Sequence, residues 1–154
     1  MYPFILALHN ILRWVIVVFA VLALVRAYRG WLGKRPWTSL DRRAGVFFGS
    51  AMDTQLLVGL LLYVVFSPIT KAALADIGAV MRDAGARFFA VEHLFWMFLA
   101  VVFAHLGTIL PRKASTSLAK FQRAAIPFAI MFILLVVAIP WWRPLLRIFS
   151  ISIP

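Results

Sequence analysis

Four long runs of apolar residues alternate with shorter polar segments along the chain. The runs cover approximately residues 4–25, 44–66, 87–110 and 125–139, and they are rich in Leu, Ile, Val, Phe and Ala. A helix needs about 20 predominantly apolar residues to cross a bilayer. The pattern therefore predicts an all-α protein whose four spans form a transmembrane helix bundle.

The polar segments predict how these spans are connected. Residues 26–43 contain glycines and a proline that interrupt a long continuous helix. Residues 69–86 have apolar side chains at helical spacing, which predicts one short amphipathic helix on the membrane surface, with Thr70 as its cap. Pro127 is expected in the first turn of the fourth span, where proline is tolerated.

The composition agrees with a membrane protein. Of the 154 residues, 64% are hydrophobic and 14% are charged, and the mean hydropathy is +0.97. Soluble domains are usually about half apolar. The length suits one integral membrane domain over residues 1–154, embedded in the lipid bilayer.

The net charge of +11 comes from basic residues that cluster at the ends of the apolar runs. This distribution indicates anchoring to anionic headgroups and excludes nucleic acid as the expected partner. Residues 26–43 hold six basic residues, and the connector after the third span holds four. The positive-inside rule therefore predicts that both of these loops are cytoplasmic and that both termini lie outside.

The chain has no cysteine. This excludes disulfides, thiolate metal sites, iron–sulfur clusters and covalent attachment of haem through cysteine. We also find no glycine-rich phosphate loop and no group of residues arranged for hydrolysis or group transfer.

The predicted spans contain ionisable side chains, which are costly in lipid and are read by default as functional. They are His9 and Arg13 in the first span, Asp53 in the second, and Glu92, His93 and His105 in the third.

Two of these histidines are expected at nearly the same depth. With a rise of about 1.5 Å per residue, His9 lies roughly 8 Å and His93 roughly 9 Å below the outer face. Imidazoles at one level on two helices are the arrangement needed for two axial ligands to one haem iron. The alternative is that each histidine only forms a hydrogen bond to a neighbouring helix.

The third histidine, His105, belongs to a different level. It lies roughly 18 Å from His93 along the helix and about 120° around it, so the two cannot bind the same iron. Asp53 is expected nearby, either as an ion-pair partner of Arg13 or as a hydrogen-bond acceptor for His105. Arg13 shares a helix face with His9 and could instead face a haem propionate.

Glu92 directly precedes His93 and points about 100° away from it. It could serve proton coupling, or it could pair with Arg87 or Arg82. A path for protons or ions through Glu92, Asp53 and His105 is therefore a further hypothesis.

Several motifs occur in order over most of the chain. They are His9-Asn-Ile-Leu-Arg-Trp14, Gly33-Lys-Arg-Pro-Trp37, Gln55-Leu-Leu-Val-Gly-Leu-Leu-Leu-Tyr63, Arg87-Phe-Phe-Ala-Val-Glu-His93 and Ala138-Ile-Pro-Trp141. As a set they resemble a family of small four-span bacterial membrane proteins described as cytochrome b. The resemblance implies non-covalent haem b, electron transfer and a place in the bacterial inner membrane, and it matches His9 and His93 to the ligand positions.

The chain departs from this family at Asp53, where members often carry a histidine. The departure implies that an inner haem using that position and His105 is lost, which leaves one haem or none. It also leaves room for a haem-free protein.

We therefore expect a subunit with one haem b that relays electrons in a respiratory or photosynthetic chain, rather than a stand-alone enzyme. Its partners would be a quinone, a larger membrane complex or further copies of itself. The alternative is a haem-free accessory or assembly subunit of a larger membrane complex.

Overall fold

A computed structural model of the chain describes residues 1–142, and these form helices and short turns without strands. The main helices are α1 (Tyr2–Leu32), α2 (Ser39–Leu61), α6 (His93–Ile109) and α7 (Ser117–Ala138). With their helical extensions, they make four segments long and apolar enough to cross a membrane. This confirms the predicted all-α, four-span fold. The short apolar tail of the sequence, residues 144–154, lies outside the described residues.

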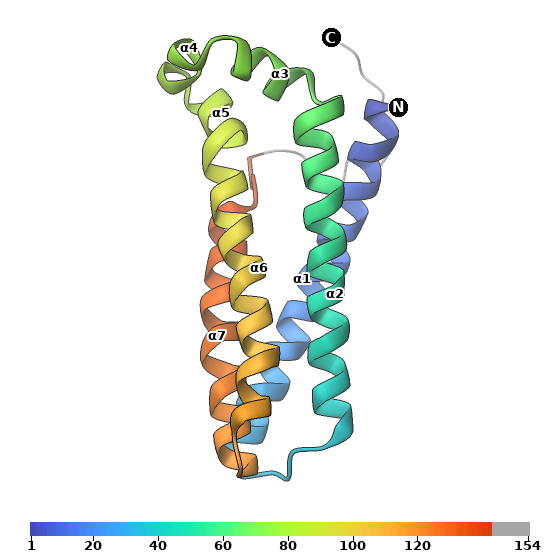
Figure 1. Cartoon of the computed structure of the whole chain (residues 1–154), viewed down its shortest axis with the longest axis vertical. Coiled ribbons are helices and arrows are strands. Elements are labelled where there is room, and N and C mark those ends of the chain that lie inside the picture. The colour runs from blue at the N-terminus through green and yellow to red at the C-terminus, as the bar shows by residue number, and fades with distance from the viewer. Residues whose placement is uncertain (143–154) are drawn as a thin grey trace.

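The long helices run side by side as a bundle (Figure 1). Helix α1 packs against α2 and α7, and α6 also packs against both α2 and α7. The loop over 33–38 and the turn η3 (Leu110–Lys113) lie at one end, which we call the basic end. The N-terminus and the short helices between α2 and α6 lie at the other end, which we call the histidine end. Which end faces the cytoplasm stays a prediction.

The buried core lies toward the basic end of the bundle. Its largest fully buried side chains are Phe48 and Met131, and Phe48 meets Phe128 edge to face with ring centroids 5.8 Å apart. Small residues of α1, α6 and α7 let the backbones approach, as is usual between membrane helices. They include Ala20, Ala27, Ala100, Ala104, Ala124 and Ala125.

Two glycines bring bulky rings directly against the backbone. A Cβ atom built on Gly107 of α6 would lie only 2.3 Å from the Phe128 ring, and one on Gly30 of α1 would lie 2.2 Å from the Phe121 ring. Real Cβ atoms do not come that close to other heavy atoms. The packing of α7 against α6 and α1 therefore depends on the missing side chain at each glycine.

Much of the apolar surface outside this core faces outward. Phe4, Phe19, Leu22, Phe47 and Phe98 are among the large hydrophobic side chains that are exposed. In water such a surface would drive aggregation, whereas lipid tails solvate it. The exposed apolar belt therefore supports a multi-pass membrane protein.

The segment over 69–86 differs from the prediction of one amphipathic helix. It forms α3 (Pro68–Ala75), α4 (Ile77–Arg82) and α5 (Ala84–Arg87). The side chains of Ser67, Asp76 and Asp83 each accept a hydrogen bond from the backbone N–H three residues ahead and cap these helices. Each aspartate starts a new helix and ends the previous one. The predicted cap Thr70 was also wrong, because Ser67 caps α3 and Thr70 lies inside it.

The fourth helix begins earlier than its apolar run. Thr116 caps α7 through a hydrogen bond from the backbone N–H of Ala119, so the helix starts in the polar connector. Pro127 consequently lies inside the helix and not in its first turn. It removes one backbone hydrogen bond there.

Two π-helical turns interrupt the long helices at the histidine end. They are η1 (Leu62–Phe66), which continues α2, and η2 (Phe88–Glu92), which precedes α6. The Tyr63 hydroxyl in η1 donates to the Ala90 carbonyl in η2 at 2.8 Å. Inserted π turns are often found at functional sites, because they offset the side chains that follow.

Candidate functional site

The structure places the imidazoles of His9 and His93 beside one another at the histidine end. Their ring centroids are 6.4 Å apart and the ring planes differ by 65°. His9 belongs to α1, and His93 is the first residue of α6. The two residues that the sequence placed at one depth therefore also face each other across the bundle.

His9 is held by Gln55 of α2. The Gln55 amide Nε2 donates to the His9 carbonyl at 3.0 Å and lies 3.3 Å from the His9 ring nitrogen Nε2. A Cβ atom built on Gly59 would meet the His9 ring atom Cε1 at 3.3 Å. Glycine at this position therefore leaves room for the imidazole between α1 and α2.

Two polar atoms beside this contact have no hydrogen-bond partner within residues 1–142. They are the ring nitrogen Nδ1 of His9 and the amide oxygen Oε1 of Gln55, and both are buried. A buried polar atom usually has a partner, and one without it calls for an explanation. An additional group bound between the helices would supply that partner.

His93 is fixed from its other side. Its Nδ1 lies 2.8 Å from the backbone carbonyl of Ala138 at the end of α7, so the protonated nitrogen donates to that oxygen. The rings of Phe88 and Phe89 lie 5.8 and 6.4 Å from the imidazole, and Trp142 packs on Phe88. The hydrogen bond leaves Nε2 as the nitrogen of His93 that can bind a further group.

The separation of the two imidazoles suits a metal between them. Imidazole nitrogens bind metal ions at about 2.0 Å, so rings on opposite sides of one ion have centroids about 6 Å apart. A hydrogen bond from the second ring nitrogen to a backbone carbonyl, as in His93, is the usual arrangement for a metal-bound histidine. The described residues contain no group of three or more His, Cys, Asp and Glu residues that could hold a metal ion by themselves. Two histidines could serve only a metal whose other ligands come from elsewhere, as in a porphyrin.

Arg13 follows His9 by four residues on α1, so the two side chains share a helix face. Its guanidinium also lies 5.6 Å from the centre of the Trp14 ring. Arg13 therefore contributes positive charge beside the histidine pair.

The third histidine pairs with the acid of α2. His105 Nε2 and Asp53 Oδ1 are 2.8 Å apart, which selects His105 over Arg13 as the partner of Asp53. A Cβ atom on Gly49 would lie 3.7 Å from the His105 ring, in ordinary contact. The side chains of His105 and Asp53 are 40% and 47% exposed, so this pair lies on the surface of the bundle.

Glu92 forms an ion pair with Arg87. The Arg87 Nε donates to Glu92 Oε1 at 2.8 Å, which is one of the two pairings that the sequence allowed. Glu92 is 13 residues before His105, or about 20 Å along the helix, so the structure does not bring it together with the Asp53–His105 pair.

Sequence reasoning missed three groups that hold the histidines. Gln55 and the Ala138 carbonyl contact the imidazoles, and the Tyr63 hydroxyl fixes the π turn that precedes His93. Gln55 could have been found, because it is a polar side chain inside an apolar run. The Ala138 carbonyl could not, since a backbone acceptor leaves no signal in the sequence.

Replacing Tyr63 with phenylalanine should destabilise the histidine end modestly. The change removes only the hydroxyl that donates to Ala90, and hydrogen bonds between membrane helices contribute about 0.6 kcal/mol on average. Thermal unfolding in detergent should show a small decrease in the stability of the variant. An unchanged or increased stability would contradict a stabilising role for this bond, and Tyr28→Phe, in the basic half of α1, is the matched control.

The fold, the exposed apolar surface and the polar residues within the bundle define a multi-pass membrane protein of the four-helix class. No protein-family model, no curated protein and no solved structure matches the chain.

Proposed function

We propose that this protein is a membrane subunit that binds one haem b and relays electrons in a respiratory or photosynthetic chain. The observation that carries the proposal is the pair of imidazoles from α1 and α6 with ring centroids 6.4 Å apart. The buried His9 Nδ1 without a hydrogen-bond partner in the described residues adds to it. The resemblance of the sequence to small cytochrome b proteins points the same way.

His9 and His93 would hold the iron from two sides. When bound, haem supplies an iron that takes up and releases one electron. The Ala138 carbonyl orients His93, and Gln55 fixes the backbone of His9, so neither helix end can turn freely. Arg13 provides positive charge that would face a propionate and stabilise the more negative state of the site.

The surroundings favour electron transfer over chemistry on a substrate. The rings of Phe88 and Phe89 lie beside His93, and Trp142 packs on Phe88. Within residues 1–142, no acid is paired with either histidine of the pair. The partner that exchanges electrons would be a quinone, a larger membrane complex or a second copy of this chain. The location that fits this role is the bacterial inner membrane.

One observation favours the alternative, a haem-free accessory or assembly subunit. His9 and His93 already contact Gln55 and Ala138, and such contacts can hold helices together without any cofactor. In that case the histidine pair is a structural contact between α1, α2, α6 and α7.

The test is the reduced-minus-oxidised absorption spectrum of the protein purified from a host supplied with haem precursor. We expect a b-type α band and one haem per chain by pyridine haemochrome assay. A well-folded preparation that shows no such band after reconstitution with haemin would overturn the proposal and favour the accessory subunit.

A further inference from the structure

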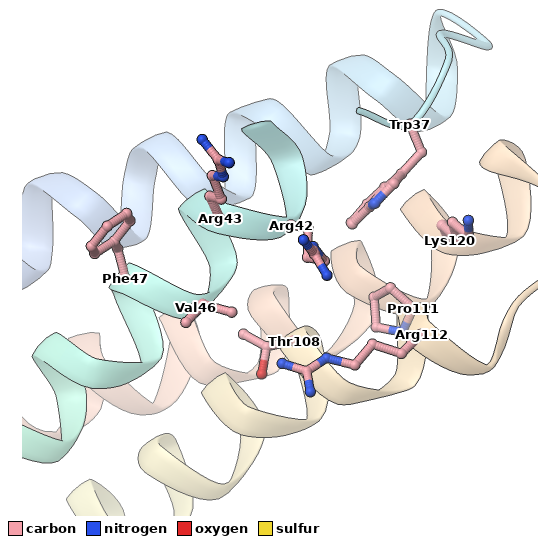
Figure 2. Close-up of a pocket in the computed structure, with 9 residues that line it drawn as sticks. All are labelled: Trp37, Arg42, Arg43, Val46, Phe47, Thr108, Pro111, Arg112 and Lys120. Atoms are coloured by element: carbon pink, nitrogen blue, oxygen red, sulfur yellow. The ribbon is translucent and has the colours of Figure 1, made fainter. Parts of the chain in front are cut away.

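A pocket of about 770 Å³ lies at the basic end, between the start of α2, the end of α6 and the start of α7. Its lining has basic side chains from separate elements together with apolar ones (Figure 2). The lining residues are Trp37, Arg42, Arg43, Val46, Phe47, Thr108, Pro111, Arg112 and Lys120. It is far from the histidine pair, and the proposed haem does not use it.

The basic side chains of this pocket are not paired with acids in the described part of the chain. Within residues 1–142, none of Arg42, Arg43, Arg112 and Lys120 makes a salt bridge. The acid nearest in sequence, Asp41, is already paired with Arg26 at 2.6 Å and also accepts from Thr38. Figure 2 shows the guanidinium groups of Arg42 and Arg112 on opposite sides of the hollow. A ligand between them would have to be an anion.

The order of side chains along the helices tells which kind of anion fits. Val46 and Phe47 each follow an arginine by four residues, so they lie on the same faces about 6 Å deeper in the membrane. Both are exposed, Phe47 to 71%. Thr108 lies one turn deeper than Arg112 on the other wall in the same way. Charge at the membrane surface with apolar contact beneath it matches a headgroup with acyl chains below.

We infer that this pocket binds the phosphate headgroup of an anionic phospholipid, with the acyl chains against Val46 and Phe47. Basic pockets between membrane helices are known to bind such headgroups. The two guanidinium groups suit a phosphodiester, because arginine offers paired N–H donors to phosphate oxygens. Lys120 and Trp37 close the side toward α7 (Figure 2).

The experiment is native mass spectrometry of the purified full chain in neutral detergent. The protein is titrated separately with phosphatidylglycerol, phosphatidylcholine and inorganic phosphate. We expect one phosphatidylglycerol to bind well before any phosphatidylcholine, and no binding of inorganic phosphate at the same concentrations. Equal binding of the two lipids would overturn the inference, and inorganic phosphate binding as tightly as phosphatidylglycerol would assign the site to free phosphate.

Variants show whether this pocket is the site. Arg42→Gln combined with Arg112→Gln should weaken phosphatidylglycerol binding on the order of thirtyfold, given the usual contribution of each basic residue at a membrane surface. The matched control is Lys34→Gln with Lys113→Gln, which removes two charges from the same end but outside the pocket. Equal loss in both double variants would mean that diffuse charge binds the lipid, and it would overturn the site. If the first variant does not fold, Arg42→Lys combined with Arg112→Lys keeps the charge and removes the paired N–H donors of arginine. This variant should bind phosphatidylglycerol more weakly than the unaltered chain. Unchanged binding would contradict the proposed role of the paired N–H donors.

Discussion

Replacing His93 with alanine is expected to abolish the b-type absorption band of the purified protein. The change removes one of the two imidazoles whose ring centroids are 6.4 Å apart, and the iron would lose one of the two protein ligands that would hold it. Replacing His9 should have the same result, since each histidine comes from a different helix. The measurement is the haem-to-protein ratio with the reduced-minus-oxidised spectrum of each variant.

The control is His105→Ala, which removes a histidine from the same helix as His93. His105 pairs with Asp53 on the surface of the bundle and should leave the band intact. Circular dichroism and gel filtration of all three variants separate loss of ligation from loss of fold. A band that disappears only with His105→Ala would show that the ligand assignment to His9 and His93 is wrong.

Replacing Gly107 with alanine is expected to lower the stability of the bundle by about 1 to 3 kcal/mol, as other overpacked cores do. The new Cβ atom would lie 2.3 Å from the Phe128 ring, which is almost completely buried. Either α6 and α7 must separate or the ring must leave its rotamer. Thermal unfolding in detergent, followed by circular dichroism, measures the loss.

Two comparisons make this prediction specific. Gly78→Ala adds the same methyl group in the short helix α4, where the nearest atom is the Asp76 carboxylate at 3.4 Å, and its effect should be small. Gly107→Ala combined with Phe128→Leu should recover part of the lost stability, because the smaller side chain makes room. If the single and double variants lose stability additively, the glycine and the ring do not limit each other.

The sequence was sufficient for the spans because the length of an apolar run and the thickness of a bilayer are linked directly. It was not sufficient for the segment after α2. There the apolar spacing suggested one helix, but the capping preference of Asp76 and Asp83 divides it, and capping competes locally with helix continuation. The early start of α7 has the same cause, since Thr116 caps the helix before the apolar run begins.

For the candidate site, depth could be predicted and direction could not. The constant rise of a helix placed His9 and His93 at one level, and the structure sets their rings beside each other. Whether Asp53 contacts Arg13 or His105 depends on how α1, α2 and α6 are rotated about their axes. That rotation is set by contacts such as Gly49 against the His105 ring, which a single sequence does not reveal.

The π turn before His93 sets the angle between the segment that precedes it and α6. It contains one residue more than an α-helical turn would need, so the segment before it is offset by about 100° from the helix that follows. Deleting one residue between positions 88 and 92 would give the backbone regular α-helical hydrogen bonds, yet it would turn α5 and the Ala90 acceptor away from Tyr63. The contact between Ala90 and Tyr63 therefore depends on the number of residues between α5 and α6, and alignments of this region should treat a one-residue gap as a change in direction.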